Sequence, residues 1–97
     1  MALAASSVNA ANPGEHNYNP AEGLVPDAET AIKIAVAVWE PIYGKERIKK
    51  QQPYTATLSN GIWRVEGSLP KEFTRGGVAV AEISKVNGKV LRVSYGK

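Results

Sequence analysis

Cysteine is absent from this 97-residue chain, and histidine and methionine occur once each. Without cysteine there is no disulfide framework, no thiol nucleophile and no thiolate ligand for a metal. The single histidine, His16, lies in a polar N-terminal stretch that gives it no catalytic partner. No run of residues approaches the roughly 20 apolar positions that a membrane-spanning helix needs. The composition therefore predicts a protein without thiol chemistry and without a membrane span.

Residue sets that carry catalysis or cofactor binding are also missing. No glycine-rich phosphate loop follows an expected strand, and no group of His, Asp or Glu has the spacing of metal ligands. Thr55, Thr57 and Ser94 have no neighbouring base that would make them nucleophiles. We therefore expect no catalytic residue, no metal and no cofactor, and we predict that the protein is not an enzyme.

Positive charge is in modest excess, with a net charge of +3. All twelve Lys and Arg residues lie in residues 24–97 with seven of the nine acidic residues, so that part carries five excess positive charges. The densest cluster comprises Lys45, Arg47, Lys49 and Lys50, interrupted by Glu46. Nucleic-acid-binding surfaces interleave bases with aromatic residues, and this cluster does not. The pattern favours a solvated helix end or a protein-facing patch, and we expect no nucleic-acid partner.

Residues 1–23 differ in composition from the rest of the chain. They are small, polar and proline-bearing without hydrophobic periodicity, which predicts a flexible arm. Val8 and Ala10 occupy the −3 and −1 positions of a small-residue cleavage pattern. We interpret this as the remnant of an export signal and expect a periplasmic location; an accidental Ala and Ser run in a cytoplasmic protein is the alternative. Residues 24–97 are expected to form one small domain.

A helix is predicted from Ala28, because Asp27 is a favoured N-cap residue and apolar side chains then recur at helical spacing. The residues on this face are Ala28, Ala31, Ile32, Ala35, Val38, Trp39 and Ile42. Proline inside a helix costs about 3 kcal/mol, so Pro41 is expected to kink or end the helix near Glu40, with Gly44 as its final stop. A short second helix is expected at Lys45–Lys50, anchored by Ile48.

The stretch WEPIYG, residues 39–44, is therefore interpreted as a corner. Trp39 and Ile42 are expected to stay on the core face while Pro41 redirects the chain toward the first strand. Tyr43, beside Gly44, is placed to rim a groove, because tyrosine combines an apolar ring with a polar tip.

The first strand pair is predicted from YTATLSNGIWRVEG, in which Asn60–Gly61 forms a two-residue hairpin loop. The expected pairs on one apolar face are Leu58 with Trp63, Ala56 with Val65 and Tyr54 with Gly67. Thr57 and Arg64 then share the opposite, polar face.

The second strand pair is predicted from AVAVAEISKVNGKVLRVSYG, where a three-residue loop of Val86, Asn87 and Gly88 keeps apolar side chains on one face. The expected pairs are Ile83 with Leu91, Ala81 with Val93, Ala79 with Tyr95 and Glu82 with Arg92. Gly88 is expected to adopt the left-handed conformation. The predicted fold class is α+β, a kinked N-terminal helix packed on one face of a four-stranded antiparallel meander sheet.

From Val25 to Lys97 the sequence resembles a family of small bacterial immunity proteins. The motifs that match in order are IYG, QxPY, NGIW, GGVA, AEIS and the closing GK. The resemblance implies a nuclear-transport-factor-two-like fold and a gene beside that of a polymorphic or contact-delivered toxin. It also implies a function without catalysis, in which the protein binds a cognate toxin and blocks its catalytic site or substrate groove.

An interface of this kind combines polar residues with an aromatic or arginine anchor. The candidate partner-binding residues are Arg64, Glu66, Glu82 and Arg92 on the open sheet face, Glu72, Phe73 and Arg75 in the connection between the hairpins, and Tyr43. The basic balance disfavours a nuclease toxin, whose own positive cleft would prefer an acidic inhibitor.

Two other functions stay open at this point. The strand–turn–strand half of the chain is also similar to small secreted protease-inhibitory propeptide modules. A small-ligand-binding or enzymatic domain on the same fold would need a carboxylate or histidine inside a cavity, and none is predicted to point inward. The genes that flank this one would separate these classes.

Overall fold

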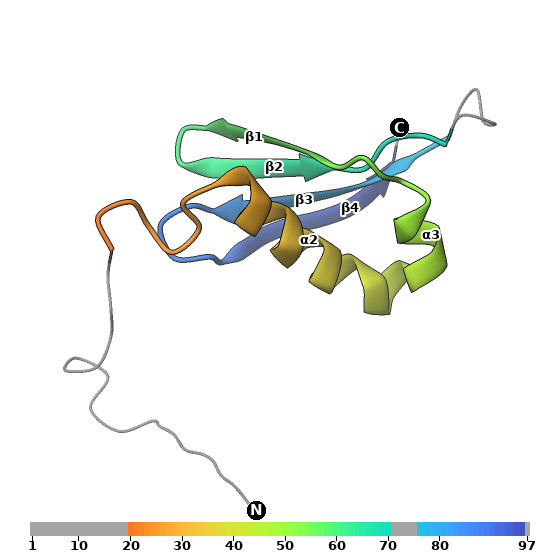
Figure 1. Ribbon diagram of the computed structural model, residues 1–97, viewed down its shortest axis with the longest axis horizontal. Coiled ribbons are helices and arrows are strands. Elements are labelled where there is room, and N and C mark those ends of the chain that lie inside the picture. The colour runs from red at the N-terminus through yellow and green to blue at the C-terminus, as the bar shows by residue number, and fades with distance from the viewer. Residues whose placement is uncertain (1–19, 71–75, 97) are drawn as a thin grey trace, which may run out of the picture.

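The computed structural model describes residues 20–70 and 76–96. It confirms the α+β class, with a helix over one face of a four-stranded antiparallel sheet in the order β1-β2-β3-β4 (Figure 1). The elements are α2 (Ala28–Tyr43), α3 (Lys45–Lys49), β1 (Thr55–Ser59), β2 (Ile62–Glu66), β3 (Val78–Ser84) and β4 (Val90–Gly96). The candidate residues Glu72, Phe73 and Arg75 lie outside the described residues.

Helix α2 begins where the sequence predicts. Asp27 has an extended backbone, and its Oδ1 accepts a hydrogen bond from the Thr30 backbone N–H at 2.8 Å. Hydrogen bonds with Thr30 lower the pKa of Asp27, because they favour the carboxylate over the carboxylic acid. The cap and the charge near the helix N-terminus therefore both stabilise this first turn.

Acidification is expected to destabilise the fold partly through Asp27. Its pKa is lower in the folded state than in the unfolded chain, so its contribution is present above about pH 4 and is lost as the pH falls through the folded pKa. Urea unfolding at several pH values should show a weaker acid loss for Asp27→Asn, because asparagine caps the helix without titrating. Glu29→Gln, an exposed change in the same turn, is the control. An acid loss equal in Asp27→Asn and the unmodified protein would contradict the expectation.

Helix α2 does not end near Glu40, and the prediction that Gly44 is its final stop is confirmed. The helix runs through Pro41 to Tyr43 and ends at Gly44, whose φ is 99° and whose N–H donates to the Glu40 carbonyl at 2.8 Å. Pro41 removes the donor that would pair with the carbonyl of Ala37. Because Ala37 is exposed, water can bond that carbonyl, and the helix tolerates the proline in its last turn. The corner of the chain therefore lies at Gly44, where α2 meets α3.

The assignment of Ile42 to the core face is also wrong. Trp39 is fully buried, whereas Ile42 is 57% exposed. Beyond Trp39 the core is closed by Ile48 of α3, which is fully buried. The short second helix and its buried anchor, Ile48, are thus confirmed.

The β1–β2 hairpin has the predicted register. Leu58 lies opposite Trp63 and Ala56 opposite Val65. The loop residues Asn60 and Gly61 have φ values of 51° and 76°, as a type I′ turn requires.

The β3–β4 register is confirmed from Ala79–Tyr95 to Glu82–Arg92, but the predicted pair of Ile83 with Leu91 is wrong. A β-bulge between Glu82 and Ile83 sets Ile83 opposite Val90. Val90 and Val93 are three positions apart, so in a regular strand their side chains would point to opposite faces of the sheet. The bulge allows both to share the face of Ile83 and Ala81. The loop is one residue longer than predicted, because Ser84 and Lys89 close it with a 2.9 Å hydrogen bond. Gly88 has the expected left-handed φ of 74°.

Residues 20–23, which were predicted to be part of the flexible N-terminal arm, belong to the described structure. The Gly23 N–H donates to the Pro20 carbonyl at 3.0 Å, and Lys85 Nζ donates to the carbonyl of Glu22. A Cβ at Gly23 would overlap the Lys85 carbonyl oxygen, so only glycine allows this approach. The segment is held against the β3–β4 loop.

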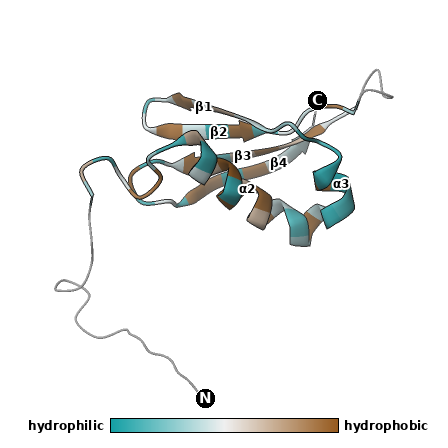
Figure 2. Ribbon diagram, in the orientation of Figure 1, coloured by the Kyte–Doolittle hydropathy of each residue, from teal (hydrophilic) through white to brown (hydrophobic). Residues whose placement is uncertain are grey.

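The core lies between α2 and the inner face of the sheet. Trp39 and Trp63 both belong to it, at 0% and 8% exposure. Trp39 Nε1 donates to the Val80 carbonyl at 3.3 Å, and Trp63 Nε1 donates to the Val25 carbonyl at 2.8 Å. Both indoles therefore bury their rings without leaving an N–H unpaired. Figure 2 shows the contrast between the apolar segments of the strands and the hydrophilic α3.

Candidate functional site

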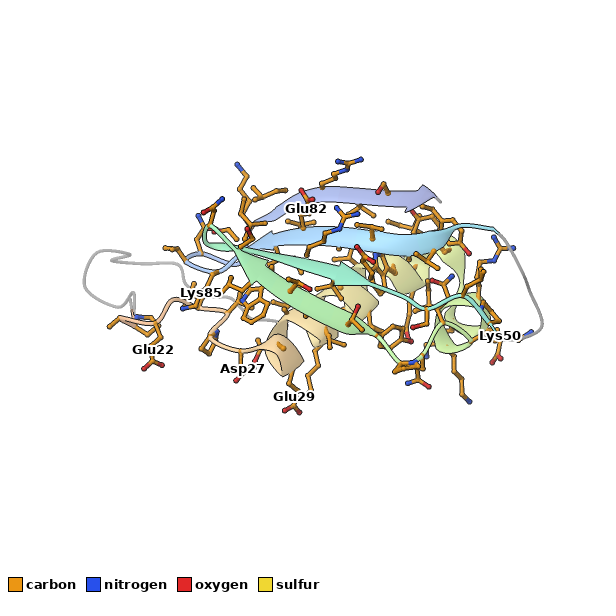
Figure 3. All side chains as sticks on the ribbon, turned by 90° about the horizontal axis from the view of Figure 1, so that it is seen from above. Glu22, Asp27, Glu29, Lys50, Glu82 and Lys85 are labelled. Carbon is orange, nitrogen blue, oxygen red and sulfur yellow. The ribbon has the colours of Figure 1, made fainter. Side chains whose placement is uncertain are left out.

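The face of the sheet opposite α2 carries a row of polar side chains across all four strands. Because Trp63 and Val65 point into the core, Arg64 between them points to the other face. The observed registers align this residue with others in one row: Thr57, Arg64, Glu82 and Arg92. The next row along the strands comprises Thr55, Glu66, Val80 and Ser94. We call these two rows the helix-free face; in Figure 3 the labelled Glu82 lies on the side of the sheet away from α2.

Arg64 is held between two carboxylates on this face. Its Nε donates to Glu66 Oε2 at 2.6 Å, and its Nη1 donates to Glu82 Oε2 at 3.0 Å. These contacts raise the pKa of Arg64, with the hydrogen bond to Glu66 as the largest cause. The three side chains, which we call the arginine clamp, are half-exposed, so the clamp adds little to stability. Its effect is to fix the guanidinium in one orientation.

Arg92 differs from Arg64 although both flank Glu82 in the same row. The sequence pattern predicts Glu82 opposite Arg92, and the backbone register confirms this pair. The ion pair forms with Arg64 instead, and Arg92 makes no salt bridge with any residue in 20–70 or 76–96. Bonding by Glu66 already places the Arg64 guanidinium beside Glu82. Arg92 therefore presents a charge that is not neutralised within the described part of the chain.

A hollow of about 480 Å³ lies between the two arginines. Its lining includes Arg64, Arg92, Val80 and Ser94. Val80 is only 7% exposed and supplies an apolar floor among polar walls. A space of this kind accepts a side chain of a partner that combines an apolar stem with a polar end.

Tyr43 lies apart from the other candidate residues. Its ring packs against that of Tyr95 from β4, with the centroids 4.8 Å apart. Both rings line a larger cleft beside α3. Tyr95 also borders the hollow between the two arginines. The structure thus brings together four of the eight predicted residues on one face and places Tyr43 at a second surface.

Ser94 and Tyr95 are not among the site residues predicted from the sequence. The alternation of β4 would have placed Ser94 beside Arg92 on the polar face. Tyr95 carries no such signal, because its neighbours come from α2 and α3.

The described residues contain no group of three or more His, Cys, Asp or Glu side chains that could hold a metal ion. Within the same ranges, neither helix has the length and apolar character needed to cross a bilayer. The surface features that the described residues form are a polar sheet face and a cleft.

A helix packed on one face of a four-stranded antiparallel sheet makes this a small α+β domain. Residues 30–97 match the family described as "NTF2 fold immunity protein", and the chain belongs to that family. The resemblance drawn from the sequence motifs is thereby confirmed.

Two curated relatives, both from Escherichia coli (strain K12), are similar to the chain. The first is "Uncharacterized protein YhhH", 31% identical over 74 residues that make up 76% of this chain and 58% of the relative. The second is "Uncharacterized protein YbbC", 38% identical over 68 residues that make up 69% of this chain and 55% of the relative. The chain spans somewhat over half the length of these relatives. No solved structure matches it.

Proposed function

We propose that this protein neutralises a cognate toxin by binding it one to one and covering its catalytic site or substrate groove. The helix-free face is the contact surface, and the arginine clamp is the observation that carries the proposal. Membership of an immunity protein family supports a toxin as the class of partner. The partner itself is the toxin encoded by the neighbouring gene.

The clamp suits an interface for energetic reasons. An arginine that is already fixed by Glu66 and Glu82 loses little conformational freedom when a partner covers it. Arginine is also enriched among the residues that dominate binding energies. The two carboxylates and two arginines form an alternating charge pattern, which rejects partners with a mismatched pattern. The face therefore offers specificity without a catalytic group.

Binding without turnover predicts one copy of this protein per toxin molecule. Calorimetric titration of the purified neighbouring toxin should give a molar ratio near one, and toxin activity should vanish at the same ratio. Protection far below equimolar amounts would indicate an enzyme. The absence of a complex at micromolar concentrations would rule out the proposed function.

Arg92 is the residue that tests the surface. Arg92→Glu is expected to weaken toxin binding by roughly ten- to a hundredfold, because it puts like charges against the partner groups that faced an arginine. Arg92 has no ion pair with a described residue, so its reversal removes no contact of the clamp. Arg64→Glu would instead place a third carboxylate beside Glu66 and Glu82. It would lower the stability of the protein as well as its affinity for the toxin, and the two effects could not be separated.

Lys33→Glu is the matched control for Arg92→Glu. Lys33 is an exposed base on α2, and its pairing with Glu29 at 3.5 Å is a surface contact of little energetic weight. The control should change the dissociation constant less than about twofold, and both variants should unfold like the unmodified protein. Equal effects of the two reversals would show that net charge matters and that the helix-free face does not.

A further inference from the structure

A cleft of about 880 Å³ opens at the α3 end of the molecule. It lies between α3, the end of α2 and the last residues of β4, with Tyr43 and Tyr95 among its walls. Figure 3 labels Lys50 at this end, far from Glu22 and Lys85 at the other. We call it the sheet-end cleft; the arginine clamp takes no part in it.

The charge along this cleft is predominantly positive. The segment from Lys45 to Lys50 carries four bases and one acid, Glu46, for an excess of three positive charges. Lys45, Arg47 and Lys50 line the cleft together with Glu46, so three bases face one acid there. All four bases are exposed, and none forms a salt bridge with a residue that the structure describes. This differs from Arg64, whose charge two carboxylates offset, and it leaves the cleft positive.

Tyr95 adds an oriented donor to this positive surface. Gln51 is 2% exposed, and its Oε1 accepts the Ala79 backbone N–H at 2.9 Å. That bond fixes the amide, so its Nε2 faces the Tyr95 hydroxyl at 2.8 Å. An amide nitrogen only donates, and the tyrosine oxygen is therefore the acceptor. The hydroxyl proton of Tyr95 is left to donate to a third group.

The apolar part of the cleft is preformed as well. The rings of Tyr43 and Tyr95 pack at an interplanar angle of 57°. Gln51 also ties α3 to the sheet through its backbone, because its carbonyl accepts the Ser68 N–H at 2.7 Å. The donor, the rings and the bases are therefore held on rigid elements, which reduces the entropy lost on binding.

We propose that the sheet-end cleft binds a carboxylate-rich segment of a protein partner, with the α3 bases attracting the acidic side chains and the Tyr95 hydroxyl donating to one carboxylate. Charge complementarity selects the acidic ligand, and the fixed hydroxyl selects a hydrogen-bond acceptor. The identification of the partner as the toxin rests on the proposed function. The acidic character of the ligand rests on the charge of the cleft alone.

Hexaglutamate, acetylated and amidated at its ends, is the probe that tests the cleft on the full chain. In NMR titrations of ¹⁵N-labelled protein at low salt, the amides of Gly44–Gln51 and of Tyr95 should shift and saturate, and the amides of Arg64 and Glu82 should not. Lys45→Gln/Lys50→Gln should weaken the dissociation constant by about fivefold or more, because two of the cleft's charges are removed.

The matched control is Lys33→Gln/Lys89→Gln, which removes the same net charge from α2 and the β3–β4 loop. It should change the dissociation constant less than about twofold. Tyr95→Phe keeps the ring and removes the donor, so it should weaken binding with all bases present. Equal effects of the two lysine pairs, or an unchanged affinity in Tyr95→Phe, would overturn the proposal, because either would leave only a general attraction of opposite charges.

The neighbouring toxin provides a second readout. Lys45→Gln/Lys50→Gln should weaken the toxin complex, and a complex that weakens with Arg92→Glu but not with the α3 pair would overturn the cleft as a toxin contact while the proposed function stands. A protein that binds hexaglutamate in the cleft but binds no toxin would overturn the proposed function and support the acidic ligand class.

Discussion

Trp63→Ala is expected to lower the free energy of unfolding by about 3–5 kcal/mol, a large share of the stability of a domain of this size. Trp63 is 8% exposed in the centre of the sheet, so its removal leaves a cavity between β2 and α2. The change also leaves the Val25 carbonyl without the indole N–H that it accepts at 2.8 Å. Loss of packing and loss of a buried hydrogen bond act in the same direction.

Urea unfolding followed by circular dichroism measures this effect. Leu58→Ala is the matched control, because Leu58 lies directly opposite Trp63 on the edge strand β1 but is 43% exposed. It should cost about 1 kcal/mol or less, since less apolar area returns to water. Trp63→Phe should fall between the two, because it keeps a ring and loses the donor. A Trp63→Ala variant as stable as Leu58→Ala would mean that the tryptophan does not anchor the core.

Those parts of the fold that depend on neighbouring residues could be predicted from the sequence. The Asn60–Gly61 loop fixes the β1–β2 register by itself, and Asp27 marks the first turn of α2. The predictions that were wrong concern features that depend on contacts between residues far apart in the sequence. Ile42 is exposed while Ile48 of α3 is buried in the core, and a β-bulge moves the partner of Ile83 from Leu91 to Val90. Neither outcome can be seen in a local sequence pattern.

The candidate site also has features that could be predicted from the sequence and features that could not. Strand registers alone place Arg64, Glu82 and Arg92 in one row, and the structure agrees. The strand register does not determine which of the two arginines pairs with Glu82. Arg64 does so because Glu66, two residues along β2, also bonds its guanidinium and holds it beside Glu82. At the sheet-end cleft, Tyr43 was predicted to rim a groove and does line it. The share of Tyr95 could not be predicted, because Gln51 bonds Ala79 and Tyr95 across 28 and 44 positions of the chain.

A second large effect is expected where Gly67 packs against the Gln51 side chain, which bridges Ala79 and Tyr95. Gly67→Ala is expected to cost about 2–5 kcal/mol, because a Cβ at this position would overlap Gln51 Oε1 and lie 2.8 Å from Gln51 Cβ. Gly67 is buried, and its N–H donates to the Ala79 carbonyl at 2.9 Å, so the strand cannot easily move away. The Gln51 amide must move instead, and the buried Ala79 N–H then loses its acceptor.

Gly96→Ala is the control that isolates this contact. It is the same substitution in the same sheet, but a Cβ at Gly96 meets nothing within 4 Å and the backbone φ there is not positive. It should change the free energy of unfolding by less than about 0.5 kcal/mol. Gly67→Ala should also remove the hexaglutamate response of the Tyr95 amide, since Gln51 no longer holds the hydroxyl. If urea unfolding showed the two alanine variants to be equally stable, Gln51 would not be the rigid bridge between α3 and the sheet. The hydroxyl of Tyr95 would then have no fixed orientation to offer a ligand.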